Sequence, residues 1–182
     1  MFSLLLMTLS LSSSHAEAAD LKVGVGLNVG ALIPVADLGP GPLPRADLSL
    51  RLPVLDGRLA PVLSVGWSQL AATGAGEDER VGDGAYTWQL QQRMLPIGLG
   101  LTARFLDPQK WVQPELTLQG EAVRLATATD GASAGADFGI TQETAWAPGV
   151  HVAAGVALKL GPGEGVGALC WTRAPLHGVL TG

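Results

Sequence analysis

Hydrophobic and polar residues alternate along the segment 21–33, LKVGVGLNVGALI. A period of two residues is typical of a β-strand whose two faces meet different surroundings. One face of this predicted strand is wholly apolar, and the other is mostly small or polar. The pattern returns repeatedly along the chain, so the sequence predicts a meander of antiparallel strands.

Six further segments show similar alternation. Asp56 and Gly57 separate the second and third candidates, and this dipeptide is typical of a tight β-hairpin. In the fourth candidate the apolar residues change from even to odd positions, which predicts a β-bulge near residues 92–94. The six segments are 45–54, 58–70, 86–105, 111–123, about 146–160, and a strand that starts near 165.

The connections between these segments are of two kinds, and the kinds alternate. Short turns are predicted near 55–58, 106–110 and 161–164. Long loops, rich in Gly, Pro, Ala or polar residues, are predicted at 34–44, 71–85 and 126–145. In an up-and-down meander, alternate connections lie at the same end. Short turns at one end and long loops at the other are typical of transmembrane β-barrels.

Alternation alone fits both a membrane barrel and a soluble barrel, which turns its apolar face inward. A soluble exterior would carry many long polar side chains. The less apolar face here is instead rich in small residues, such as Gly24, Gly26, Ser49, Ser64 and Gly98. We therefore predict an all-β, antiparallel up-and-down transmembrane β-barrel. A soluble secreted or periplasmic ligand-binding β-barrel stays the alternative.

Composition narrows the function classes. Charged residues make up 15% of the 182 residues and the net charge is −5, which gives no reason to expect nucleic acid as a partner. The chain has one cysteine, so an internal disulfide framework is excluded. His151 and His177 have no second ligand at a suitable spacing, and we predict neither a metal site nor a cofactor.

The N-terminus has features of an export signal. The apolar segment 4–11 precedes Ala16-Glu17-Ala18, which fits the small-residue pattern of a cleavage site, although Met1-Phe2-Ser3 contains no basic residue. We expect residues 1–18 to be a cleaved signal peptide and residues 19–182 to form the barrel domain.

The runs LPIGLGLTARF (95–105) and GVHVAAGVALKLGPGEG (149–165) look like barrel strands and turns. Through them the chain resembles the small outer-membrane β-barrel superfamily, the eight-stranded OmpA/OmpX-like, porin-type domains of Gram-negative bacteria. The resemblance implies a location in the outer membrane, contact with its lipid, and insertion by the barrel assembly machinery. It implies no single activity.

Charged residues of both signs fall on the predicted inner face, where eight strands leave just enough room for side chains. We expect them to pair in a lumen filled by side chains. The protein would then be a monomeric, non-enzymatic barrel with a structural role that displays its loops. A narrow porin-type channel is the alternative. These residues are Lys22, Asp47, Arg51, Arg104, Glu115, Glu121 and Lys159.

Tryptophans lie near the ends of the predicted strands, as in the aromatic girdles at membrane interfaces. The predicted interface residues are Trp67, Trp88, Trp111 and Trp146.

The chain offers seven strand candidates, whereas bacterial single-chain barrels have even numbers. Members of the resembled family end on an aromatic residue of the last strand, but this sequence ends in Thr181-Gly182. A truncated sequence, a strand supplied by another chain, and filling of the gap by the N-terminal segment are three explanations. We favour truncation, with the closing C-terminal strand missing.

Overall fold

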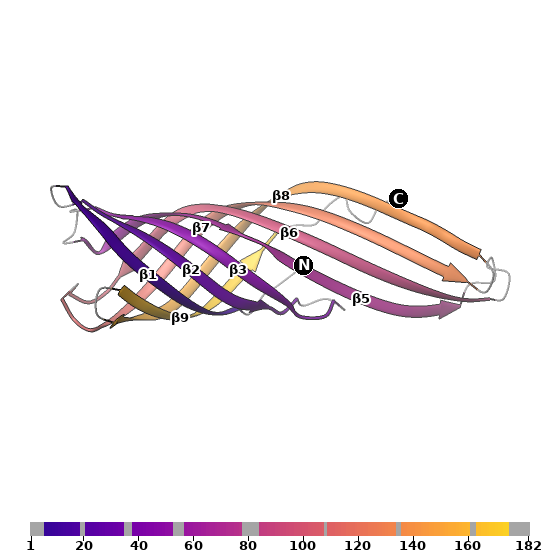
Figure 1. The fold of residues 1–182 in the computed structure, drawn as a ribbon, viewed down its shortest axis with the longest axis horizontal. Coiled ribbons are helices and arrows are strands. Elements are labelled where there is room, and N and C mark those ends of the chain that lie inside the picture. Colours follow the sequence, from indigo (N-terminus) through magenta and orange to yellow (C-terminus); the bar gives the residue numbers. More distant parts are fainter. Residues whose placement is uncertain are drawn as a thin grey trace.

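The computed structural model describes residues 6–18, 21–34, 38–52, 57–77, 84–107, 109–133, 136–160 and 163–174. Within these ranges the chain is almost entirely β-strand (Figure 1), and it contains no helix that is long and apolar enough to cross a membrane. The strands are β1 (Leu6–Ala18), β2 (Leu21–Leu32), β3 (Gly41–Arg51), β4 (Leu59–Gly66), β5 (Ser68–Glu77), β6 (Ala85–Arg104), β7 (Val112–Ser133), β8 (Ala136–Leu160) and β9 (Gly163–Arg173).

The described strands close into a ring. β4 pairs with both β3 and β6, and β1 pairs with both β2 and β9, each time antiparallel. Only Trp67 separates β4 from β5, and the two pair with successive parts of β6, so they share one position in the sheet. The nine described segments therefore occupy eight positions. The predicted all-β, antiparallel up-and-down barrel is confirmed.

The N-terminal segment lies in the gap that the seven predicted strands leave. β1 pairs with β2 from Leu9↔Val29 onward, and with β9 from Leu6↔Cys170 to Ser13↔Gly163. The structure thus follows the third explanation, in which this segment fills the gap. Pairing on both sides leaves no open edge between β2 and β9, which hydrocarbon would penalise. Cleavage after residue 18 stays a prediction.

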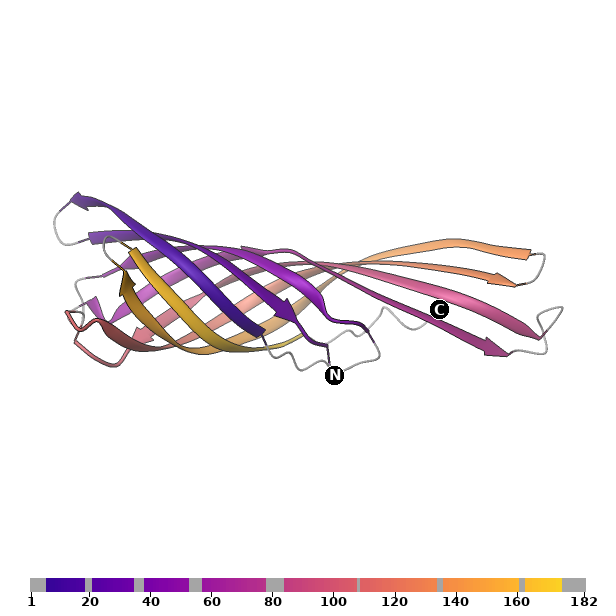
Figure 2. The ribbon, with the colours of Figure 1, turned by 60° about the horizontal axis from the view of Figure 1, so that its bottom comes forward.

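Four strands continue well beyond the ring. β5, the first half of β6, the second half of β7 and the first half of β8 form an antiparallel sheet that projects from one end of the barrel (Figures 1 and 2). We call it the projecting sheet. The long loop predicted at 126–145 is therefore wrong over most of its length, and the one predicted at 71–85 is wrong for residues 71–77, while residues 78–83 lie outside the described part of the chain. β3 already begins within the third predicted loop, 34–44, at Gly41. These segments carry little hydrophobic alternation, but their main chains are paired, with one register shift between β7 and β8 at Asp130/Ala132.

The predicted bulge near residues 92–94 is also wrong. β6 pairs with β7 from Tyr86↔Ser133 to Arg104↔Glu115 without a register shift. Its apolar residues change parity because the strand leaves the barrel wall. Ile97 and Leu99 point outward from the barrel, whereas Trp88 lies on the face that continues the lumen into the projecting sheet.

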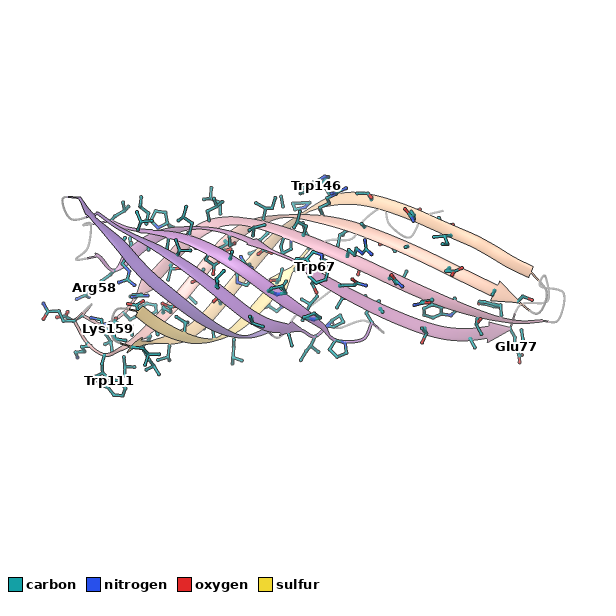
Figure 3. All side chains as sticks on the ribbon, viewed as in Figure 1. Arg58, Trp67, Glu77, Trp111, Trp146 and Lys159 are labelled. Atoms are coloured by element: carbon teal, nitrogen blue, oxygen red, sulfur yellow. The ribbon has the colours of Figure 1, made fainter. Side chains whose placement is uncertain are left out.

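Exposed apolar side chains cover the outside of the ring. Leu99 is 66% exposed and Leu118 is 56% exposed. Figure 3 shows Trp111 at the turn end of the barrel, and Trp67 and Trp146 where the projecting sheet begins. Such a surface fits hydrocarbon, so the barrel is of the transmembrane type, the reverse of the soluble alternative. Other members of this apolar belt are Val25, Leu27, Val29, Leu48, Leu63, Val65, Ile97, Leu101, Leu116, Val150, Val156, Leu158 and Leu169.

Candidate functional site

Arg45 of β3 lies at the centre of the lumen and is buried. Its Nη1 donates to Glu121 Oε1 at 2.9 Å, and its Nη2 donates to Ser64 Oγ at 2.5 Å and to Gln119 Oε1. Its Nε lies 3.4 Å from Asp47 Oδ1. These five residues, the central network, join β3, β4 and β7 across the barrel. A buried guanidinium is tolerated only when it is paired in this way.

Small neighbours leave room for the central network. A Cβ added to Gly98 would lie 2.7 Å from Ser64 Oγ and 3.1 Å from Arg45 Nη2. Ser64 itself is a small side chain whose hydroxyl also donates to Gln119 Oε1 at 2.8 Å. On the other side, Asn28 Nδ2 donates to Asp47 Oδ2. The glycines and serines of the inner face therefore provide the space that the long polar side chains fill.

A second network lies at the turn end of the lumen. Arg104 donates from Nη1 and Nη2 to the two carboxylate oxygens of Glu164, at 3.0 and 2.7 Å. Arg51 Nη2 donates to Glu164 Oε2 at 2.6 Å, and Arg104 Nη2 lies 3.2 Å from Glu115 Oε2. We call these four residues the turn-end network. The charges of the two arginines and two glutamates balance, so these side chains fill the turn end of the lumen without adding a net charge.

His151 of β8 is buried beside the central network. Its Nδ1 shares a hydrogen bond of 2.8 Å with Thr172 Oγ1 and lies 3.9 Å from Glu121 Oε1. Among the described residues, no group of three His, Cys, Asp or Glu side chains could hold a metal ion. His151 thus adds a hydrogen bond between β8 and β9 rather than a ligand set.

Above the central network the lumen becomes apolar. Leu32, Leu43 and Leu70 form one buried cluster with Cys170, and Val123 and Leu125 belong to a second. Between these clusters lies a cavity of about 40 Å³. The lumen is therefore layered, from the turn-end network through the central network to apolar side chains near the projecting sheet.

The structure places most of the charged residues that the sequence assigns to the inner face. Lys159 is exposed at the turn end, and the side chain of Lys22 lies outside the described side chains. The other five take part in one of the two networks, namely Asp47, Arg51, Arg104, Glu115 and Glu121.

Two network residues were not predicted from the sequence, Arg45 and Glu164, and each pairs with two oppositely charged side chains. A signal for Arg45 was present, because it shares the parity of Asp47 and Arg51 on the same strand. Glu164 was assigned to a turn, whereas β9 already begins at Gly163.

Three of the four tryptophans predicted at the interface are exposed on the outside, Trp67, Trp111 and Trp146. Trp88 does not lie there. Its indole packs over Gly74 of β5, on the inner face of the projecting sheet, and a Cβ on Gly74 would overlap the ring. The sequence could not distinguish the two positions, because each tryptophan lies near a predicted strand end.

The outer face of the projecting sheet carries amide and charged side chains among alanines and the exposed Ile140, whereas the barrel wall is aliphatic. A shallow hollow of about 300 Å³ lies over this sheet. Its lining includes Gln89, Gln91, Arg93, Asp130 and Gln142. Amide and charged groups that are exposed in this way can bind a polar partner, and they are unsuited to hydrocarbon.

Fold, apolar belt and filled lumen together define an outer-membrane type of β-barrel with a projecting sheet. No protein-family model and no curated protein matches the chain. Among solved structures, the crystal structure of the outer membrane protease OmpT from Escherichia coli aligns with 95% of this chain and 93% of that chain. The identity is 10% and the TM-score is 0.36.

This comparison corrects the prediction of a protein without enzymatic activity. The aligned structure is that of a protease, which is an enzyme. At this low similarity, the alignment assigns no activity to this chain.

Proposed function

We propose that the protein is a monomeric outer-membrane barrel of the OmpA/OmpX-like kind that holds its projecting sheet at the cell surface. In this proposal the barrel contacts outer-membrane lipid, is inserted by the barrel assembly machinery, and serves as a structural base. The observation that supports it is the change along β6, from an aliphatic outer face at Leu99 to a polar one at Gln89 and Gln91.

Surface labelling tests which side the sheet occupies. Gln89→Cys places a thiol on the exposed outer face of the projecting sheet, and Gln109→Cys places one at the exposed turn end, while Cys170 is buried. We expect a membrane-impermeant maleimide to label Gln89→Cys on intact cells and Gln109→Cys only after permeabilisation. Labelling in the opposite order, or recovery of the protein in the periplasm without detergent, would contradict the proposal.

The layered lumen supports a barrel that does not conduct, in contrast to the alternative of a narrow channel. Arg45 contacts partners on β4 and β7, and Arg104 contacts partners on β7 and β9, so polar side chains cross the lumen at two levels. Planar-bilayer recording should show no stable channels for the wild-type protein. Reproducible single-channel steps would favour the channel instead.

A further inference from the structure

Two arginines lie side by side on the outer surface, where the barrel wall passes into the projecting sheet. Arg93 of β6 pairs with Ala126 of β7, and Arg124, two residues before Ala126, pairs with Leu95. The two arginines, which we call the arginine pair, are therefore diagonal neighbours on one face, where Cα atoms lie about 7–8 Å apart. Both side chains are exposed. Because two cations at this spacing repel each other, the surface favours an anion between them.

No salt bridge neutralises the arginine pair within the described part of the chain, whereas each arginine of the two lumen networks is paired with a carboxylate. Asp130 faces the same side of the sheet, but it lies opposite Gln89, four residues from Arg93 and thus about 13 Å away along the strand. Guanidinium groups bind phosphate oxygens through parallel N–H donors. The arginine pair therefore suits a phosphate group.

The arginine pair lies at the edge of the apolar belt. Toward the turn end, the outward residues of β6 include Ile97 and Leu99, which are aliphatic and exposed. Trp146 pairs with Arg124 across the β7–β8 register and is exposed, and Figure 3 shows it where the projecting sheet begins. Tryptophan is enriched at the level of lipid head groups. A phosphate bound here would thus lie at the depth of a lipid phosphate, with aliphatic side chains beneath it for acyl chains.

On its other side the arginine pair borders the hollow of about 300 Å³, which Arg93 helps to line. This volume is at the lower end of the roughly 300–1,000 Å³ typical of small-molecule sites. Gln91 of β6 and Gln142 of β8 both pair with Ala128 of β7, so two amides flank a small residue across the hollow. Each amide can donate and accept hydrogen bonds, which matches a group that carries several hydroxyls.

Two carboxylates, those of Asp130 and Glu143, also line the hollow. Ionised carboxylates only accept hydrogen bonds, so they suit hydroxyl donors and repel a phosphate. The charges therefore orient a ligand, with its phosphate at the arginine pair and its hydroxyls in the hollow.

We propose that the arginine pair and the hollow bind an anionic lipid. Its phosphate lies between Arg93 and Arg124, its polyhydroxy head group fills the hollow, and its acyl chains lie on the apolar belt. A soluble ligand with the same head group would lack the contact with the belt, which favours the lipid. This inference rests on the membrane location in the proposed function. Lipid binding in detergent does not depend on which side the projecting sheet faces, so its failure would leave the labelling result on intact cells unaffected.

Native mass spectrometry of the full chain in detergent, titrated with lipids of identical acyl chains, tests the proposal. Phosphatidylinositol is the probe. Phosphatidylglycerol has the same charge but a smaller head group, and phosphatidylcholine carries a cation and no hydroxyl on its head group. We expect one phosphatidylinositol to bind, at least threefold more tightly than phosphatidylglycerol and tenfold more tightly than phosphatidylcholine. Equal affinity for phosphatidylinositol and either other lipid would overturn the proposal.

The soluble head group myo-inositol 1-phosphate distinguishes a lipid from a free phosphate ligand. It should bind at least tenfold more weakly than phosphatidylinositol, because it makes no contact with the apolar belt. Equal affinity would contradict the assignment to a lipid.

Variants of exposed residues place the binding on this surface. Arg124→Gln should weaken binding of both anionic lipids at least tenfold, because it removes one of the two guanidinium groups. Gln142→Ala should weaken only phosphatidylinositol, at least threefold, because the smaller head group does not extend to this amide. Arg173→Gln is the matched control, since it removes an exposed arginine at the end of β9, two strands from β7. Wild-type affinity in Arg124→Gln, or an equal loss in Arg173→Gln, would contradict the site.

Discussion

Three strands, β6, β7 and β8, run through both the barrel wall and the projecting sheet, and their side chains differ between the two regions. In the wall, Leu99 of β6 and Leu118 of β7 point outward and are aliphatic, while Gln119 on the inner face is buried and hydrogen-bonded. In the projecting sheet the outward positions of β6 are polar, such as Gln89 and Gln91, and the inner face carries Trp88. Main-chain pairing passes unchanged from one region to the other.

Whether the apolar residues of a strand occupy odd or even positions thus depends on the surroundings of the strand as well as on its geometry. A one-residue slip and a change of solvent give the same signature in sequence, because each moves the apolar residues to alternate positions. Only the pairing distinguishes them, and β6 keeps its register with β7 throughout, so the change of parity in β6 is not a bulge.

The largest expected effect comes from removing β1, which belongs to the barrel alone. A chain of residues 19–182 would leave β2 and β9 with open edges, at a cost of several kcal/mol for each unpaired group in hydrocarbon. When refolded in detergent, it should lose heat-modifiable gel mobility and protease resistance. Deletion of residues 1–5, which keeps β1 whole, is the control. A compact, resistant barrel from 19–182 would show that β1 is dispensable and would favour the cleaved signal peptide.

Arg45→Ala should destabilise the barrel by about 3–5 kcal/mol, because it leaves the buried Glu121 carboxylate and the half-buried Asp47 carboxylate without their cation. Arg93→Ala is the matched control in the projecting sheet, where the side chain is exposed, and it should change stability by less than about 0.5 kcal/mol. Urea unfolding in detergent, followed by gel mobility, measures both. Equal effects would mean that the central network does not support the barrel.

Leu118→Arg puts a charge in the middle of the apolar belt and should cost about 2–4 kcal/mol. On the same strand, Ala132→Arg lies on the exposed outer face of the projecting sheet. There a charge should be nearly neutral. Unfolding from lipid vesicles provides the measurement. If the two arginines are tolerated equally, the assignment of the belt to lipid is wrong.

Trp88→Ala should loosen the projecting sheet alone, by about 0.2–1 kcal/mol, since it removes the indole that covers Gly74 across the β5–β6 pair. Amide hydrogen exchange should rise over residues 72–77 and stay unchanged in the barrel. Trp146→Ala, on the exposed outer side, serves as the control. Faster exchange throughout the barrel would contradict the independence of the two regions.

The sequence predicted those parts of the fold in which one face of a strand meets apolar surroundings. β2 was found within one residue of its end, and the alternation around Asp47 and Arg51 placed both on the inner face. The β6 part of the projecting sheet falls in the strand predicted over 86–105. Its β5, β7 and β8 parts escaped detection because neither face is uniformly apolar, so their Gly-, Ala- and Thr-rich segments resemble loops. In β1, Leu9 and Leu11 alternate with Ser10 and Ser12, but the apolar run before them also fits a signal peptide.

For the candidate site, the sequence could predict which charged residues lie in the lumen, but not how they pair. Parity assigned the charged residues to the lumen, yet which cation meets which carboxylate depends on ring closure, which brings β3 near β7 and β9. The cavity left no trace in the sequence, because its walls come from chain segments far apart. The unpartnered Glu121 Oε2 is a consequence of this packing.

The turn-end network has a consequence for the lifetime of the folded state. Arg51 and Glu164, whose contact measures 2.6 Å, are separated by 113 positions in the chain. A contact between residues so distant requires β9 to be in place, so we expect it to form late in assembly. Interactions that form after the rate-limiting step leave the folding rate almost unchanged and slow unfolding. We therefore expect the Arg51–Glu164 ion pair to slow unfolding of the barrel and to leave its folding rate almost unchanged.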